Sequence, residues 1–407
     1  MKVDLERAEV EVRPAARLAR LPEYVFGRLN ALKMARRREG ADIIDLGMGN
    51  PNDPTPAPII DKLVEAVRDP RNHRYSVSAA GLFNLKREVA RYYKREYDVD
   101  VDPETEVICT IGSKEGLSHL ALALVEAGDS AIVPTPAFPP HIHSIELAGG
   151  AVVTVPIGAD PDWFDRLEDL VPAINPRPKM LLLNFPHNPT AMTTDLPFYE
   201  RAVEFARRHN ILIIHDFAYS KITFDGYVAP SFLQVPGAKE VGVEFSTMSK
   251  SFNMAGWRVG FCVGHRQVVA ALGRIKGYYD YGMFMPVQIA SIIALRECMD
   301  EVKKQAAVYQ ERRDALCAGL GRIGWPVKPP RGSMFVWAPI PEEFREMGSV
   351  DFCLMLLEEA DVAAAPGAAF GPGGDGFVRL AIVENRQRLQ QAVRQIGRAF
   401  RTRRAET

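Results

Sequence analysis

The sequence predicts an α/β protein built around a mainly parallel β-sheet, and two features of its middle part lead to this prediction. The first is a series of short apolar runs bounded by Pro, Gly or Asp, a pattern typical of strands buried on both faces of a sheet. These runs are 131–133, 151–155, 180–183, 211–214 and 261–263. The second is a helical period in the intervening segments, such as 114–127 and 197–208. Strand and helix therefore alternate, as right-handed crossovers between parallel strands require.

The pattern changes after about Ala294 and predicts a smaller α+β domain. A long charged helix is expected over 300–320, followed by strands around 334–337 and 377–383 and a Gly-rich loop at 371–376. The last helix carries Leu389, Val393, Ile396 and Phe400 on one face. With 407 residues, of which 47% are hydrophobic, the chain can form two or three compact units.

Composition argues against several classes of partner. Fifty basic and 51 acidic residues give a formal net charge of -1, so neither nucleic acid nor a membrane surface is expected as the main partner. The one basic cluster, Arg398, Arg401, Arg403 and Arg404, is interpreted as a solvated helix face. No apolar run approaches the roughly 20 residues that span a bilayer, and residues 1–20 lack the apolar core of a signal peptide. The five cysteines form no Cys-x-x-Cys pair, so a reducing, cytoplasmic location is expected.

One lysine lies in a segment suited to holding an aldehyde that ends in a phosphate. Lys250 is flanked by hydroxyls, and Arg258 follows eight positions later. A lysine amine forms a Schiff base only when it is deprotonated, which desolvation and a buried Arg258 nearby would favour. The hydroxyls of Thr247 and Ser249 and the guanidinium fork of Arg258 suit a phosphate dianion. In isolation, Ser-Lys-Ser would be explained by a polar surface turn.

Other polar residues follow apolar runs in the same way. Asn184, Asp216 and Lys250 each come directly after one, and ligands of parallel sheets bind at the carboxyl ends of strands.

A second phosphate-binding element is predicted near residue 112. Gly112, Ser113 and Lys114 open a helical segment after the apolar run 107–111, and the amides of a helix N-terminus attract phosphate.

These blocks resemble class I aminotransferases that depend on pyridoxal phosphate. The matching blocks follow the order of that family over nearly the whole chain. In addition to the Lys250 segment they are Gly47 to Pro51, Tyr75, Gly112 to Gly116, Pro136 to Pro139, Asn184 to Thr190, Asp216 to Tyr219 and Phe377 to Leu380. Residues 274–282 and 20–26 are most similar to the bacterial glutamate-pyruvate (alanine) aminotransferase branch.

The resemblance implies a fold type I architecture. It gives a large domain at 56–294, with a mainly parallel seven-stranded sheet flanked by helices, and a small α+β domain formed by 1–55 together with 295–407. It also implies a homodimer in which Tyr75 reaches the phosphate in the neighbouring site.

The resemblance assigns pyridoxal phosphate to a group of residues. Lys250 would bind the aldehyde and act as the catalytic base, and Asp216 would keep the ring nitrogen protonated. A helix N-cap is the alternative reading of Asp216. Tyr219 and Asn188 would donate to the phenolate oxygen, and Phe138 would stack on the ring face, where many relatives have Tyr or Trp. The phosphate would be held by Gly112, Ser113, Lys114, Thr247, Ser249, Arg258 and the second subunit's copy of Tyr75.

The amino acid substrate is expected to bind through its α-carboxylate. Arg379 would hold it as a bidentate pair, with Gly49 and Asn188 close by. A surface salt bridge is the alternative for Arg379. Ala191 stands where relatives commonly have Gly, so a left-handed backbone is not assumed there.

The expected reaction is a ping-pong transfer of the amino group of an L-amino acid, alanine, to a 2-oxo acid, 2-oxoglutarate. The alternatives are aspartate or LL-diaminopimelate aminotransferase, a C–S β-lyase and a regulator without turnover. Candidates for contact with the substrate side chain are Lys276, Tyr279, Tyr281, Tyr24 and Arg28.

The histidines give no metal site. His141 and His143 lack a third ligand at a recognisable spacing and are expected to face solvent or the substrate channel. His215 should point away from Asp216, its neighbour on a strand.

Overall fold

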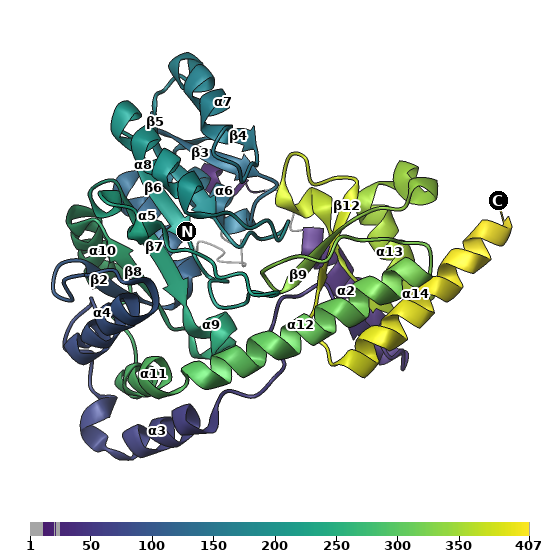
Figure 1. Ribbon diagram of the computed structural model, residues 1–407, viewed down its shortest axis with the longest axis horizontal. Helices are drawn as coiled ribbons and strands as arrows, with labels where there is room; N and C mark the ends of the chain where they lie inside the picture. The colour runs from purple at the N-terminus through teal and green to yellow at the C-terminus, as the bar shows by residue number, and fades with distance from the viewer. Residues whose placement is uncertain (1–10, 20, 22–24, 407) are drawn as a thin grey trace, which may run out of the picture.

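A seven-stranded sheet forms the centre of the large domain in the computed structural model, which describes residues 11–19, 21 and 25–406 (Figure 1). The strand order is β2-β8-β7-β6-β5-β3-β4, and β8 runs antiparallel to the other six strands. The strands are β2 (Val107–Thr110), β3 (Ser130–Thr135), β4 (Ala151–Pro156), β5 (Pro178–Asn184), β6 (Leu212–Asp216), β7 (Gly242–Thr247) and β8 (Gly260–Gly264). The predicted fold class and its mainly parallel sheet are therefore confirmed.

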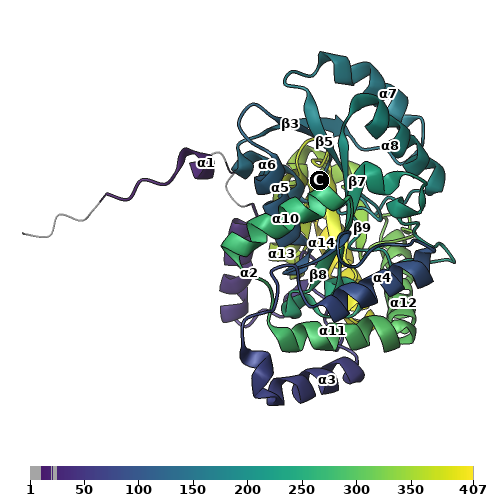
Figure 2. The same ribbon diagram turned by 90° about the vertical axis from the view of Figure 1, so that its left-hand side faces the viewer.

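Helices cover both faces of this sheet, so each strand buries two sets of side chains. In Figure 2, α5 (Gly112–Leu124), α6 (Pro139–Ala148) and α10 (Arg266–Tyr279) lie on one side, with α4 (Phe83–Tyr97), α7 (Trp163–Leu170) and α8 (Leu196–His209) on the other. Along β5, Leu181 and Leu183 enter the core against α4, α7 and α8, whereas Met180 and Leu182 enter the core against α5, α6 and α10. This double burial explains why the strands read as continuous apolar runs.

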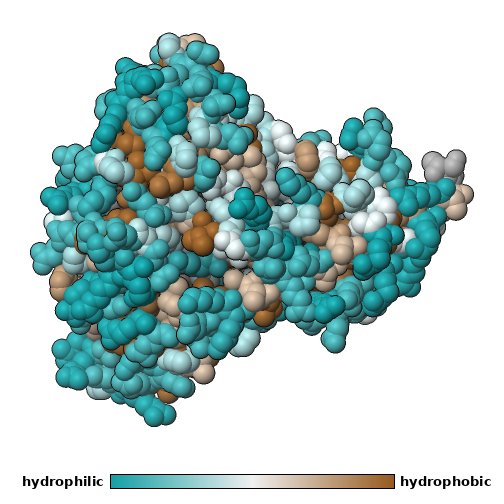
Figure 3. Space-filling view, in the orientation of Figure 1, coloured by the Kyte–Doolittle hydropathy of each residue, from teal (hydrophilic) through white to brown (hydrophobic). Residues whose placement is uncertain are grey.

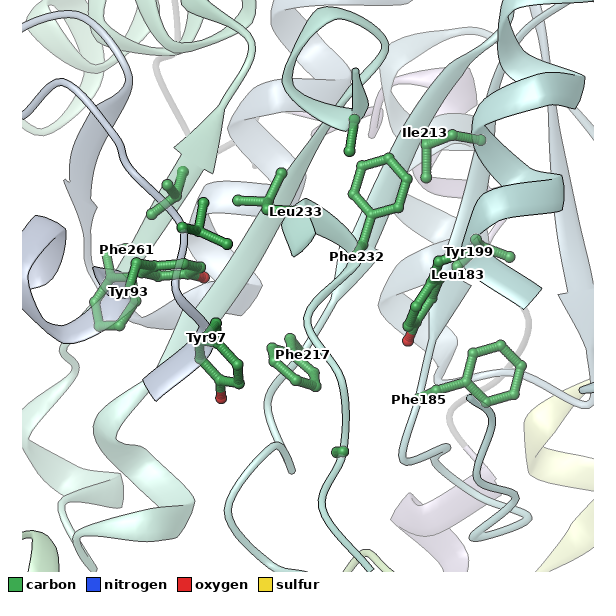
Figure 4. Close-up of a cluster of buried hydrophobic side chains, with 14 of the residues drawn as sticks. Tyr93, Tyr97, Leu183, Phe185, Tyr199, Ile213, Phe217, Phe232, Leu233 and Phe261 are labelled. Carbon is green, nitrogen blue, oxygen red and sulfur yellow. The ribbon is translucent and has the colours of Figure 1, made fainter. Parts of the chain in front are cut away.

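The core on the α8 side also contains polar aromatic and charged groups. Figure 4 shows Tyr93, Tyr199 and Phe232 within it. Glu244 on β7 is fully buried and accepts hydrogen bonds from Tyr93 Oη (2.7 Å), Ser231 Oγ (2.9 Å) and the backbone N–H of Phe232 (3.0 Å). His215 Nδ1 lies 2.9 Å from the same carboxylate. His215 thus points away from Asp216, as predicted, and belongs to a structural network.

A smaller sheet lies beside the large domain. Its order is β11-β12-β9, antiparallel throughout, with β9 (Phe335–Pro339), β11 (Ala365–Pro366) and β12 (Phe377–Ala381). Near it β1 (Ile44–Asp45) pairs in parallel with β10 (Val362–Ala363). Leu29, Ile43 and Leu46 belong to the same apolar cluster as residues of α12 (Met299–Arg322), α13 (Gly348–Ala360) and α14 (Arg386–Glu406). The N-terminal segment is therefore packed with the C-terminal part of the chain.

The remaining α-helices are α1 (Ala16–Ala19), α2 (Val25–Arg38), α3 (Ala57–Arg68), α9 (Met248–Ser251) and α11 (Met285–Glu297). Short 3-10 helices are η1 (Pro70–His73), η2 (Val171–Ala173), η3 (Phe232–Gln234), η4 (Ala238–Glu240), η5 (Ala255–Trp257), η6 (Glu342–Met347) and η7 (Gly367–Phe370). Among the described helices, none combines the length and the apolar character that crossing a membrane demands.

Candidate active site

The carboxyl ends of β5, β6 and β7 place three polar residues next to one another. Asn184 ends β5, Asp216 ends β6 and Thr247 ends β7. Asn184 Nδ2 donates to the backbone carbonyl of Asp216 (2.6 Å), and its Oδ1 accepts from the N–H of Asn188 (2.9 Å). Asn184 therefore fixes the loop that carries Asn188 against the neighbouring strand.

Asp216 is buried and paired with a histidine. Its Oδ2 lies 2.9 Å from Nε2 of His141, and its Oδ1 accepts from the N–H of Ala218 (3.2 Å). A turn follows Asp216 instead of a helix, so the N-cap alternative is wrong. The side chains of Asp216 and His141 are 6% and 4% exposed, so this carboxylate can face a buried ligand.

His141 is a residue whose position the sequence analysis misjudged. It was expected to face solvent or the channel, but it is buried on α6 with its ring 5.5 Å from that of Phe138. No local spacing indicated this burial, because the partner Asp216 lies 75 positions away in the sequence.

Lys250 lies on the short helix α9, directly after β7. Its Nζ donates to the backbone carbonyl of Gly49 at 2.6 Å. Burial, followed by the positive charges of Arg379 and Arg258, lowers the pKa of Lys250 from 10.5 to about 8, and Asp216 opposes this shift. Roughly a tenth of the amine is then deprotonated at pH 7, so Lys250 can attack a carbonyl or accept a proton.

Arg258 and the start of α5 form a cluster of hydrogen-bond donors. Nη1 of Arg258 lies 3.5 Å from Ser249 Oγ, and Nη2 lies 3.4 Å from the carbonyl of Ile111. Gly112 has a φ of 74°, and a Cβ there would lie 2.4 Å from Arg258 Nη2, so only glycine fits. Arg258 was expected to be buried, but the structure leaves it exposed.

The hydroxyls and helix amides complete the cluster. Thr247 Oγ1 and Ser249 Oγ are buried and 2.9 Å apart. Ser113 and Lys114 lie in the first turn of α5, where amides have no partner within the helix. This set of donors suits a phosphate dianion.

Arg379 reaches the same region from β12 of the small sheet. Its Nη1 donates to Asn188 Oδ1 (2.6 Å) and its Nη2 to the carbonyl of Gly47 (3.0 Å). The guanidinium carbon lies 4.0 Å from the ring centroid of Phe335 and 4.7 Å from that of Phe370. Because Arg379 is 6% exposed, the surface salt bridge alternative is wrong.

Gly49 and Ala191 have backbones that tolerate little change. A Cβ at Gly49 would lie 2.6 Å from Cζ of Phe335, so the protein itself requires glycine there, whatever binds nearby. Ala191 has a φ of 57°, so the left-handed backbone typical of glycine is kept although this chain has alanine. The bond from Ala191 N to the carbonyl of His187 (2.9 Å) accompanies this conformation.

Tyr219 and Phe138 add aromatic surface to the region. Tyr219 is buried, its ring is 5.5 Å from that of Phe335, and burial raises the pKa of its phenol. Phe138 is the N-cap residue of α6 and is partly exposed.

Several candidates have other contacts in the structure. Tyr75 is 85% exposed and touches Tyr281 edge to face, with ring centroids 5.8 Å apart. Lys276 is fully buried and bonds to Glu115 and Asp280, so its prediction as a partner of the substrate side chain is wrong. The ring of Tyr279 packs on His119 at 5.2 Å.

Two further candidates, Tyr24 and the side chain of Arg28, lie outside the described residues, as does most of the 20–26 block.

Comparison with known proteins gives a consistent result. The model of the family described as "Aminotransferase class I and II" matches residues 41–396. The chain is 50% identical over 385 residues to the glutamate-pyruvate aminotransferase AlaC of Escherichia coli, covering 95% of this chain and 93% of that protein. It is 42% identical over 386 residues to an LL-diaminopimelate aminotransferase of Moorella thermoacetica, covering 95% and 98%. The substrate-bound BacF structure from Bacillus subtilis superimposes with a TM-score of 0.90 at 37% identity, covering 96% and 98% of the two chains.

Proposed function

This chain belongs to the class I and II aminotransferases and depends on pyridoxal phosphate, and on that premise we propose that it transfers the amino group of alanine to 2-oxoglutarate. The observation that carries the proposal is the position of the Lys250 amine, which follows β7 on α9 and donates to the Gly49 carbonyl at 2.6 Å, and whose pKa is lowered by burial and by Arg379. Similarity to a glutamate-pyruvate aminotransferase supports the choice of substrates.

The donor cluster beside Lys250 fits pyridoxal phosphate. Bound there, the cofactor supplies an aldehyde for amines and a ring that accepts electrons. We assign its phosphate to Gly112, Ser113, Lys114, Thr247, Ser249 and Arg258. Gly112 has no side chain, and Arg258 packs against it. This supports the assignment because the backbone N–H groups and the guanidinium both remain accessible as donors.

We assign the ring of the cofactor to the residues at the strand ends. Asp216, oriented by His141, would hold a proton on the ring nitrogen, because a buried carboxylate stabilises a neighbouring cation. Tyr219 and Asn188 would donate to the ring oxygen. Since Asn188 Oδ1 accepts from Arg379, its Nδ2 is the donor on that side. Phe138 would pack on a ring face.

Lys250 and Arg379 divide the work on the amino acid. Arg379, oriented by Asn188 and Gly47, would bind the α-carboxylate through both Nη groups. Gly49 would line the same place. The substrate Cα would then lie near Lys250 Nζ, which would take the α-proton as general base. The same nitrogen would return the proton to complete each half-reaction.

A second candidate function uses a different amino donor. The similarity to LL-diaminopimelate aminotransferases supports LL-diaminopimelate or aspartate as an alternative amino donor. Initial rates with alanine, aspartate and LL-diaminopimelate at fixed 2-oxoglutarate decide among them. A C–S β-lyase would instead release ammonia from cystathionine without any acceptor acid.

We also propose that the protein is a cytoplasmic homodimer in which Tyr75 completes the phosphate site of the second subunit. Each subunit would consist of a large domain at 56–294 and a small domain formed by 1–55 and 295–407. The exposure of Tyr75 (85%) and Tyr278 (89%), together with exposed Val77 and Phe284, supports a contact with another copy. Light scattering measures the subunit number.

Mixing Lys250→Ala with Tyr75→Ala subunits should restore one intact site per mixed dimer, and a failure to restore activity would contradict the role of Tyr75.

Two experiments test the central proposal. Borohydride reduction of the loaded protein should attach the cofactor to the peptide containing Lys250, because a hydride fixes the bond between an amine and an aldehyde. Double-reciprocal plots for alanine at several 2-oxoglutarate concentrations should run parallel. Labelling of another peptide, or lines that intersect, would contradict the proposal.

A further inference from the structure

Helices α12 and α14 enclose a groove on the small domain, where they lie side by side (Figure 1). Its volume is about 480 Å³, within the range of small-molecule sites. Gly319, Ile323 and Val393 give it an apolar floor. A Cβ at Gly319 would lie 2.9 Å from Cγ2 of Val393, so glycine lets the two helices approach closely. Over these helices Figure 3 shows apolar surface bordered by hydrophilic residues.

Four exposed arginines form the walls of the groove. They are Arg322 of α12 and Arg394, Arg398 and Arg401 of α14, and among the described residues no acidic side chain lines the groove. The three on α14 are spaced by four and three residues, so they share one face of the helix. Like charges at this spacing destabilise a helix modestly, and a bound anion would offset that repulsion.

The other arginines of α14 form ion pairs with carboxylates. Arg386 pairs with Glu311 (2.8 Å), Arg388 with Asp42 (2.5 Å), Arg404 with Glu343 (2.5 Å) and Arg403 with Glu359. Within the described part of the chain, no carboxylate lies at ion-pair distance from the four groove arginines. The helix dipole acts within the last turn and therefore does not account for Arg394 and Arg398.

Guanidinium groups bind phosphate oxygens through paired N–H donors and stack on planar rings. Four of them above an apolar floor suit a ligand with several negative charges and an apolar ring. We propose that the groove between α12 and α14 binds a small molecule with two or more linked phosphates on an aromatic ring system, of the chemical class of a nucleoside diphosphate. The phosphates contact the arginines and the ring lies on the floor.

The test is calorimetric titration of the cofactor-loaded protein at low ionic strength with ADP, inorganic pyrophosphate and adenosine. ADP should bind once per chain, more tightly than pyrophosphate, and adenosine should bind weakest. Added salt should weaken ADP binding because these guanidinium groups are exposed. No binding of ADP would overturn the proposal, as would equal affinities for ADP and adenosine. Equal affinities for ADP and pyrophosphate would overturn the ring contact.

Paired variants separate the groove from general surface charge. Arg394→Gln with Arg398→Gln should weaken ADP binding about tenfold or more, since two charge-assisted contacts are lost. Arg386→Gln with Arg404→Gln removes the same charge from the same helix outside the groove and should change the affinity less than about threefold. Both variants should melt near the wild-type temperature and keep alanine turnover. Equal weakening in both, or binding of polyglutamate in place of ADP, would overturn the proposal.

Discussion

Lys276 is fully buried and Lys250 is half-buried, and the charges around them are opposite in sign. The ammonium of Lys276 has no exposed surface and bonds to Glu115 Oε1 (2.9 Å) and Asp280 Oδ2 (3.1 Å). Lys250 Nζ bonds to the neutral carbonyl of Gly49, and Arg379 and Arg258 are its charged neighbours of like sign. Lys276 therefore forms a paired structural contact, whereas burial and the cations beside Lys250 lower the pKa of its amine.

The surroundings of Lys276 also explain its position. Glu115 Oε2 accepts from the N–H of Ile111 at the start of α5 (2.7 Å), and Asp280 Oδ1 accepts from Gly282 N (3.0 Å). Lys276 thus connects the helix start with the loop after α10. The donor atoms of Glu115, His119 and Asp280 lie within 4.8 Å of one another, but the Lys276 ammonium already bonds to two of these residues, so we assign no metal.

The largest effect is expected from Lys250→Met, which keeps the length of the side chain but removes its amine. Alanine turnover should fall about 10⁴-fold or more, because both the nucleophile and the base are lost. Steady-state rates at saturating cofactor measure this loss. A variant with more than about 1% of wild-type turnover would show that another base serves the reaction.

The matched change Lys276→Met should act on stability instead. Leaving Glu115 and Asp280 without their cation should lower the free energy of unfolding by about 3 kcal/mol. Urea denaturation of the loaded protein measures the change, and turnover per folded molecule should fall less than about tenfold. An unchanged unfolding midpoint would mean that the two carboxylates do not depend on Lys276.

A pH series on the cofactor-free protein sharpens the contrast. The pKa of Lys250 is about 8 in the folded protein against an ordinary 10.5, so between these values the unfolded chain binds the extra proton and folding gains stability as pH rises. The free energy of unfolding should rise by about 2 to 3 kcal/mol from pH 8 to 10.5, relative to Lys250→Met. Below pH 8 the cost of the buried ammonium is fully present, so Lys250→Met should be more stable than wild type there. Parallel urea curves for the two proteins at every pH would contradict this assignment.

Asp280→Asn should have the smallest effect. Lys276 would keep its bond to Glu115, and the new amide oxygen can still accept from Gly282, so a loss of about 1 kcal/mol is expected. Thermal melts beside Lys276→Met provide the comparison. If Asp280→Asn loses as much stability as Lys276→Met, the loss would come from the contacts of Asp280 and not from leaving both Glu115 and Asp280 without their cation.

The features that could be predicted were those that follow from short stretches of sequence. The apolar runs predicted β3, β4, β5, β6 and β8, and Asn184 and Asp216 indeed end β5 and β6, while Lys250 follows β7 on α9. The conformation of Ala191 could not be predicted in this way. Alanine disfavours a φ of 57°, and the loop around His187 imposes it.

Pairs far apart in sequence account for the other misses. His141 meets Asp216 across 75 positions, and Lys276 meets Glu115 across 161. Neither contact has a local period or spacing, because it depends on which helix covers which strand end.

The sequence by itself determined the alternation of strand and helix, the burial of the sheet on both faces and the polar residues at the strand ends, because these follow from side-chain period and from the chemistry of single residues. Only the tertiary structure decided which charges lie beside each lysine. Distant segments bring these charges together, because Arg379 of the small sheet lies near Lys250 and lowers its pKa, whereas Glu115 of α5 bonds to Lys276.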